Sequence, residues 1–135
     1  MSVGILLITH GKLGQNLLDT MRQMMGGELP LRHDVLEVHL VQNDEGLILQ
    51  GQKQADRLED GAGVLLLTDA FGATPSNIAN KLAAGRNARV VSGINLPMLI
   101  RIFNYPKLAL AEMAQCAVEG GQRGIIGCPK NDTGE

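Results

Sequence analysis

The sequence predicts a doubly wound α/β fold, a mostly parallel sheet of four strands with helices on both faces. Two short runs, Val3–Thr9 and Gly63–Asp69, are apolar almost throughout, as strands buried on both faces are. Segments with apolar residues three and four positions apart follow the strand-like runs. This alternation of strands and helices requires right-handed crossovers, which place consecutive strands parallel to one another.

The first half of the chain is predicted to contain two strands and two helices. The first helix ends at Gly26-Gly27, a pair typical of helix C-termini. The second strand alternates apolar and polar residues, so we expect it at an exposed edge of the sheet. The second helix is less amphipathic and ends before Gly61. In order, these segments are Val3–Thr9, Leu13–Gly26, Asp34–Val41 and Glu45–Asp60.

The second half is predicted to contain two more strands and three more helices. We expect Thr74 to be the N-cap of its helix and Pro75 to take the first helical position, because both residue types are favoured there. Arg123–Gly127 is a candidate fifth, antiparallel strand, and the tail 128–135 is expected to be disordered. The other elements are Gly63–Asp69, Thr74–Gly85, Ala88–Gly93, Leu96–Asn104 and Pro106–Gly121.

Size and composition limit the class of protein. The 135 residues suit a single domain, 1–135, and the 44% apolar and 19% charged residues are typical of a globular chain. A net charge of −2, no basic stripe and three aromatic residues argue against a nucleic-acid partner. No signal peptide or membrane-length apolar run is visible, so we expect a cytoplasmic protein in which Cys116 and Cys128 are reduced thiols.

The two most apolar strands end in the same way. Each aliphatic run leads into a threonine and then an ionisable residue, His10 after the first strand and Asp69 after the third. In a doubly wound sheet these two strands commonly lie side by side, and ligands bind beyond their carboxyl ends. We therefore expect Asp69 to accept a hydrogen bond from one ring nitrogen of His10, which leaves the other as a nucleophile or base.

The surroundings of this pair are predicted to suit a phosphate group. The helices that follow Gly11 and Thr74 both begin at the same edge of the sheet, and helix N-termini favour anions. Gly11, Gly14 and Gly72 permit close approach of the backbone, and the Thr74 hydroxyl adds a donor. We expect phosphate contacts from Gly11, Gly72 and Thr74.

Other motifs carry less chemistry. The chain has no HxxxH motif and no His/Cys cluster, so we expect no metal site. The stretch HGKLG fits neither a Walker A loop nor a dinucleotide fingerprint. His33 and His39 flank the edge strand and are interpreted as surface residues. The three methionines of the first helix are interpreted as core residues; they are Met21, Met24 and Met25.

Three stretches together resemble the enzyme IIA component of the phosphotransferase system (PTS), mannose/fructose/sorbose family. They are ILLITHGKLGQNLL, VLLLTDAFGATPSNIA and VVSGINLPMLIRI, in the order and spacing of that family. The resemblance implies a phosphocarrier that takes a phosphoryl group from phospho-HPr on His10 and passes it to a IIB component for sugar uptake. It assigns the orienting carboxylate to Asp69 and the hydroxyl near the phosphate to Thr74.

The resemblance also implies partners. We expect a homodimer that can exchange its C-terminal strand (RGIIG), a separate IIB protein, and membrane IIC and IID components only indirectly. No cofactor is expected, because the donor is already a high-energy phosphoramidate. Exposed apolar residues would dock the partners, with Leu13, Phe71 and Met98 as candidates.

Four other classes of protein share parts of this pattern. The related subunit of dihydroxyacetone kinase usually has His-Ser where this chain has His10-Gly11. A tetrapyrrole chelatase needs further histidines or glutamates in its second half, and no histidine follows His39. A histidine phosphatase usually has arginine where Thr9 stands. A regulatory module that uses phosphorylation as its signal shares every residue with the transport function, so the sequence leaves both open, as well as the identity of the sugar.

Overall fold

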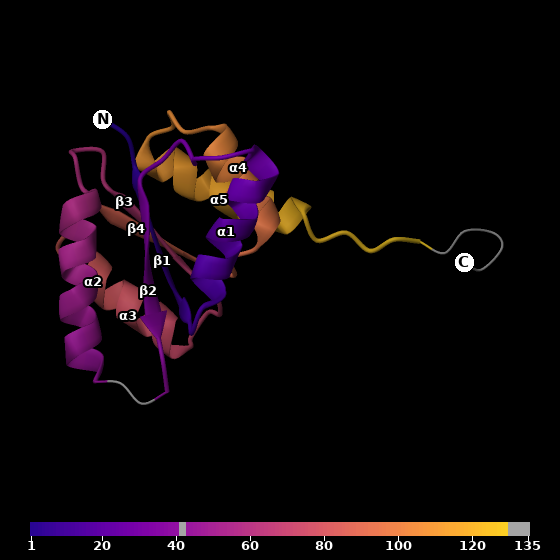
Figure 1. Ribbon diagram of the computed structural model, residues 1–135. Coiled ribbons are helices and arrows are strands. Elements are labelled where there is room, and N and C mark those ends of the chain that lie inside the picture. Colours follow the sequence, from indigo (N-terminus) through magenta and orange to yellow (C-terminus); the bar gives the residue numbers. More distant parts are fainter. Residues whose placement is uncertain (41–42, 130–135) are drawn as a thin grey trace.

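A single four-stranded parallel sheet forms the centre of the molecule. The computed structural model describes residues 1–40 and 43–129, and Figure 1 shows the sheet between two layers of helices. The strands run in the spatial order β2-β1-β3-β4, with Ile8 of β1 opposite Thr68 of β3. The predicted α/β class, the four parallel strands and the pairing of the first strand with the third are confirmed. The strand bounds are β1 (Gly4–His10), β2 (His33–Val38), β3 (Val64–Thr68) and β4 (Ala88–Ser92).

Five helices cover the two faces of this sheet. In Figure 1 α2 and α3 lie on one side of the strands, and α1, α4 and α5 lie on the other. The two sides have separate cores because alternate strand residues face opposite ways: Leu6 and Ile8 pack toward α2 and α3, whereas Ile5 and Leu7 pack toward the other three helices. The helix bounds are α1 (Leu13–Met25), α2 (Asp44–Leu58), α3 (Thr74–Ala83), α4 (Leu96–Asn104) and α5 (Leu110–Arg123).

The C-terminal predictions need correction. Arg123 is the last residue of α5, and the described residues that follow form no fifth strand. Ile125 and Ile126 are 77% and 75% exposed, because this segment leaves the body of the protein and has no strand beside it to pair with (Figure 1). The end of the tail predicted to be disordered, 130–135, lies outside the described residues.

Several element boundaries also differ from the prediction. Helix α5 begins at Leu110 rather than Pro106, because residues 105–108 form a turn closed by the Leu108 N–H and the Tyr105 carbonyl. Strand β2 ends at Val38, short of the predicted Val41, and residue 41 lies outside the described residues.

Two groups of side chains predicted from local pattern are placed differently. Met21 is fully buried, but Met24 and Met25 are 55% and 38% exposed because the last turn of α1 extends past the sheet core. His33 is half-buried rather than on the surface. Its Nε2 lies 2.6 Å from a guanidinium nitrogen of Arg22, and its ring meets Phe103 edge-on. His39 is exposed, as predicted.

Candidate functional site

His10 and Asp69 form a hydrogen-bonded pair where β1 and β3 end. The His10 ring Nδ1 lies 2.7 Å from Asp69 Oδ2, and the same oxygen accepts the main-chain N–H of His10 at 2.9 Å. The His10 side chain is 53% exposed, whereas that of Asp69 is 12% exposed. A carboxylate facing Nδ1 selects the tautomer with the proton on Nδ1, so Nε2 presents its lone pair outward.

The sheet register brings this pair together. Ile8 lies opposite Thr68, so the chain reaches His10 and Asp69 within two residues of a matched pair. The loop after β3 is anchored by the N–H groups of Gly93 and Ile94, which donate to the carbonyls of Asp69 and Thr68. Asp69 is therefore held by its backbone as well as by its side chain.

The carboxylate of Asp69 has an altered pKa. Burial by itself raises this pKa, because it disfavours the charged form. Hydrogen bonds from the His10 N–H, the His10 ring and the Ala70 N–H outweigh burial and hold the pKa of Asp69 below its ordinary value. Asp69 is therefore ionised at neutral pH and available to stabilise positive charge on the imidazole.

A small cavity opens beside His10. Its volume is about 150 Å³, and Thr74 lines it together with His10. Thr74 is the first residue of α3 and not its N-cap, which corrects the prediction. Ala73 takes the cap position because its carbonyl accepts the first helical hydrogen bond, from Asn77. The cavity is completed by Val38, His39, Leu40 and Asp44.

The predicted backbone donors do not all face this cavity. The N–H of Gly11 donates to the Val38 carbonyl at 2.8 Å, and that of Gly14 donates to Thr9 Oγ1 at 2.8 Å. Both groups are therefore used within the fold. Gly11 instead supplies the left-handed turn after β1, with φ of 50°, and Gly72 supplies a similar turn before α3, with φ of 83°.

Thr9 precedes His10 and supports the site structurally, although it was not among the predicted site residues. The Thr9 side chain is fully buried, and its hydroxyl oxygen accepts a hydrogen bond from the Gly14 N–H in the first turn of α1. Lys12, at the N-cap position of α1, makes no side-chain capping bond. The threonine before His10 thus fixes the start of α1 relative to the strand. The repeated aliphatic-Thr-ionisable pattern was the available signal, but it does not give the direction of the hydroxyl.

The predicted docking residues separate into two groups. Phe71 is 88% exposed and Leu13 is 42% exposed, and both lie in the segments that follow the two strand ends. Met98 is only 3% exposed, since it packs in the core shared by the sheet, α4 and α5, so it is removed from the candidates.

The described part of the chain contains no group of three or more His, Cys, Asp or Glu side chains able to hold a metal ion. Within the same residues, no helix combines the length and apolar character needed to cross a bilayer.

The fold and the site define a doubly wound α/β protein with a carboxylate-oriented histidine at the switch point between its central strands. The chain belongs to the family described as the PTS system fructose IIA component (EIIA-man), whose family model matches residues 4–117.

Relatives with known sequence or structure are consistent with this family. The PTS system mannose-specific EIIAB component of Escherichia coli strain K12 is 29% identical over 130 residues, which cover 93% of this chain. The chain spans only 39% of the length of that relative.

Solved structures show the same fold. The mannose/sorbose-specific IIA subunit of the phosphotransferase system from Enterococcus faecalis superposes with a TM-score of 0.85 at 23% identity, covering 98% of both chains. The PTS IIA protein associated with the fucose utilization operon from Streptococcus pneumoniae superposes with a TM-score of 0.76 at 25% identity, covering 94% of this chain and 96% of its own.

Proposed function

We propose that this protein is a phosphocarrier that accepts a phosphoryl group on Nε2 of His10 and then donates it to a second protein. The observation that carries the proposal is the 2.7 Å bond between His10 Nδ1 and Asp69 Oδ2 on a ring that is 53% exposed. The bond fixes the ring, and the exposure leaves Nε2 open to a protein-bound phosphoryl group.

The transfer balances without a cofactor. The Nε2 lone pair forms a new P–N bond while the P–N bond of a phosphohistidine on the donor breaks, and the donor imidazole leaves with the bonding pair. His10 keeps its proton on Nδ1, so its phosphorylated ring carries a positive charge. The ionised carboxylate of Asp69 balances that charge. In the second transfer a nucleophile of the acceptor forms a bond to the phosphorus while the P–Nε2 bond breaks, and the His10 imidazole leaves with the bonding pair.

Thr74 and Gly72 are the proposed contacts of the phosphoryl oxygens. Thr74 lines the cavity beside His10, and the first turn of α3 directs backbone N–H groups out of its N-terminus. Gly11 contributes the turn that follows His10 rather than a donor, because its N–H is already bonded to Val38.

The proposed donor is phospho-HPr and the proposed acceptor is a IIB component, as membership of the family suggests. Phe71 and Leu13 are the proposed docking residues, because both are exposed apolar side chains in the segments that follow the two strand ends. A phosphocarrier must release each partner, and a small contact area favours the transient complexes that such exchange requires.

We further propose that the protein is a homodimer in which the part of the predicted segment that follows α5, residues 124–127, pairs with the sheet edge of a second copy. The support is the pair of exposed side chains Ile125 and Ile126, together with the outer edge of β4, which borders a groove of about 380 Å³. Light scattering of the whole chain and of a variant with Ile125→Asp and Ile126→Asp tests this: the dimer should dissociate in the variant, and a monomeric parent chain would contradict the proposal.

The phosphocarrier proposal is tested by radiolabelling. Incubation with phosphoenolpyruvate, enzyme I and HPr should give one acid-labile phosphate per chain in the parent protein and none in His10→Ala. His39→Ala is the matched control, because His39 lines the same cavity and is also exposed. Equal labelling of His10→Ala and the parent chain would overturn the assignment.

A further inference from the structure

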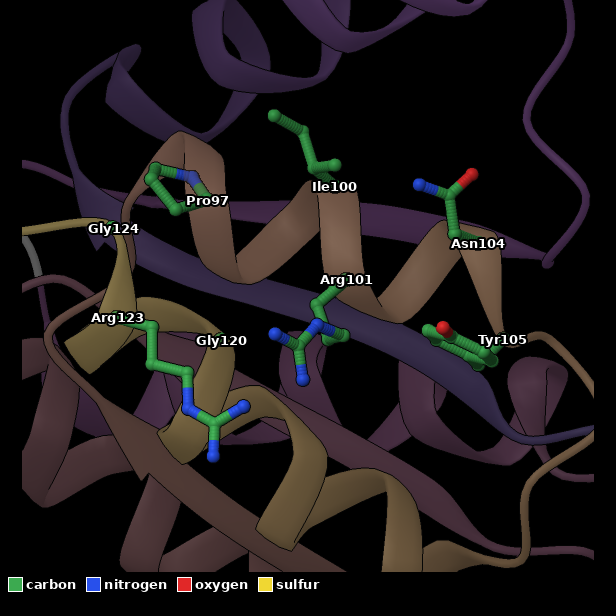
Figure 2. A pocket seen from close by; sticks show the side chains of 8 residues that line it. All are labelled: Pro97, Ile100, Arg101, Asn104, Tyr105, Gly120, Arg123 and Gly124. Atoms are coloured by element: carbon green, nitrogen blue, oxygen red, sulfur yellow. The ribbon is translucent and has the colours of Figure 1, made fainter.

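A second cavity lies between α4 and α5, formed by residues other than those around His10. Its volume is about 490 Å³, and Figure 2 shows it between the two antiparallel helices. None of the residues that line it also lines the cavity beside His10. It is lined by Pro97, Ile100, Arg101, Asn104, Tyr105, Gly120, Arg123 and Gly124.

Two arginines converge on this cavity from opposite sides. In Figure 2 the side chains of Arg101, from α4, and Arg123, from α5, extend toward each other across the space between the helices. Tyr105 lies beyond Arg101 on the same side of α4. The phenol and the two guanidinium groups thus offer hydrogen-bond donors from both sides of the cavity.

Neither arginine has an acidic partner in the part of the chain that the structure describes. Three other arginines each contact an aspartate within 4.0 Å, and these ion pairs are Arg22–Asp19, Arg32–Asp60 and Arg86–Asp56. The carboxylate nearest to the cavity along α5 is that of Glu119, and it accepts a hydrogen bond from Gln115 at 3.0 Å. Two guanidinium groups without a carboxylate partner within 4.0 Å among the described residues therefore face one cavity, and this arrangement favours an anion between them.

Close packing of the two helices holds Arg101 in place. Gly120 lies directly under its stem: a Cβ at Gly120 would stand 2.6 Å from Arg101 Cβ and 2.9 Å from Arg101 Cγ. Asn95 links the N-terminus of α4 to the C-terminal part of α5. Its Nδ2 donates to the Gly121 carbonyl at 3.1 Å, and its Oδ1 accepts the Met98 N–H and so caps α4. The guanidinium of Arg101 is thus presented from a tightly packed support rather than from a free surface helix.

We propose that the cavity between α4 and α5 binds a small phosphate monoester or inorganic phosphate between Arg101 and Arg123. A phosphate monoester carries a charge of about −1.5 to −2 at pH 7 and three terminal oxygens, which match two planar guanidinium forks. A volume of about 490 Å³ also accommodates the organic part of an ester, against Pro97 and the ring of Tyr105. This site is separate from His10 and does not depend on the proposed phosphocarrier function.

Nuclear magnetic resonance of the whole ¹⁵N-labelled chain tests the proposal. The arginine Nε–Hε signals and backbone amides are followed during titration with sodium phosphate, glucose 6-phosphate, glucose or sodium sulfate at constant ionic strength. We expect saturable shifts of the Arg101 and Arg123 signals with phosphate or glucose 6-phosphate. Tighter binding of glucose 6-phosphate identifies an organic monoester as the ligand, and equal or weaker binding identifies inorganic phosphate.

Variants decide whether the arginines form the site. Arg101→Gln and Arg123→Gln should each weaken binding by about tenfold or more, because each removes charge-assisted hydrogen bonds to the anion. Arg57→Gln is the matched control: Arg57 also lies in the last turn of its helix, α2, and should leave binding unchanged. Arg123 is exposed, so its variant retains the fold even if Arg101→Gln does not.

Three results would overturn the proposal. They are the absence of saturable shifts at Arg101 and Arg123, an equal loss of affinity in Arg57→Gln, and shifts of the same size with sulfate or glucose as with both phosphate compounds. Labelling of His10 in Arg123→Gln provides the separate readout, since it is expected to equal that of the parent chain whether or not the cavity binds phosphate.

Discussion

Replacing Asp69 with asparagine removes one charge from the site and almost nothing from its shape. In the native site Oδ2 accepts two hydrogen bonds from His10, and Oδ1 accepts the Ala70 N–H at 2.8 Å. An asparagine has one acceptor and one NH₂ donor. Either the oxygen faces His10 and the NH₂ opposes the Ala70 N–H, or the reverse arrangement places the NH₂ against the His10 ring and main chain.

The second arrangement inverts the His10 tautomer. An NH₂ group facing Nδ1 makes Nδ1 an acceptor, so the proton moves to Nε2, where it blocks attack on phosphorus. Hydrogen bonds to charged groups contribute about 1.5–3 kcal/mol. Losing that stabilisation of the charged, phosphorylated ring should slow transfer by roughly 10- to 100-fold.

Rapid-quench kinetics with labelled phospho-HPr measure the rate, and long-range ¹H–¹⁵N correlations measure the tautomer. We expect Asp69→Asn and Asp69→Ala to slow transfer without abolishing it, with Asp19→Asn, an exposed carboxamide control, at the parent rate. Where the His10 ring of the parent chain carries a single proton, that proton should lie on Nδ1. A parent spectrum with the proton on Nε2 would refute the reasoning about the ring, and equal rates in Asp69→Asn and the parent would refute the role of the carboxylate.

Four further predictions concern pH, packing, capping and docking. The lowered pKa of Asp69 contributes stability that is present above its ordinary unfolded value of about 3.9 and is lost as pH falls through the folded pKa, so urea unfolding should show the difference between parent and Asp69→Asn shrinking below about pH 4. Gly14→Ala should lower the free energy of unfolding by about 1–3 kcal/mol, because its Cβ would stand 3.0 Å from Thr9 Oγ1; an unchanged urea midpoint would contradict this contact. Asn95→Ala should lower the same free energy by about 1–2 kcal/mol through loss of the α4 cap, and Asn95→Asp should recover only part of that loss, because it keeps the capping oxygen but loses the donor to the Gly121 carbonyl. Phe71→Ser should change the stability by less than about 0.5 kcal/mol while raising the KM for phospho-HPr, and an unchanged KM would remove Phe71 from the docking surface.

The pairing of His10 with Asp69 could be predicted because it depends on topology alone. Neighbouring parallel strands end at the same edge of a sheet. The two apolar runs, Val3–Thr9 and Gly63–Asp69, indicated which strands were central. The four strands and five helices could be predicted from the spacing of apolar residues. A repeat of two residues indicates a strand and a repeat of three to four a helix, and both repeats are local properties of the chain.

The wrong predictions concern side chains and N–H groups whose surroundings depend on distances between separate helices and strands. Whether the N–H groups of Gly11 and Gly14 stay available depends on the Val38 carbonyl across the sheet and on the Thr9 hydroxyl beneath α1. Met98 was predicted to be an exposed docking residue, yet it lies in the core that α4 shares with the sheet and α5. The convergence of Arg101 and Arg123 likewise depends on how closely Gly120 lets two helices approach, which no single-helix pattern contains.

One oxygen of Asp69 holds both the main chain and the ring of the same histidine, and this closed loop of bonds exists before any partner arrives. The conformational entropy of fixing the imidazole is therefore lost when the chain folds and not when a partner binds. A docking protein meets a ring already aimed outward and needs no interaction energy to order it. Its complex can consequently remain weak and short-lived while the transfer stays fast, which suits a protein that must leave one partner in order to meet the next.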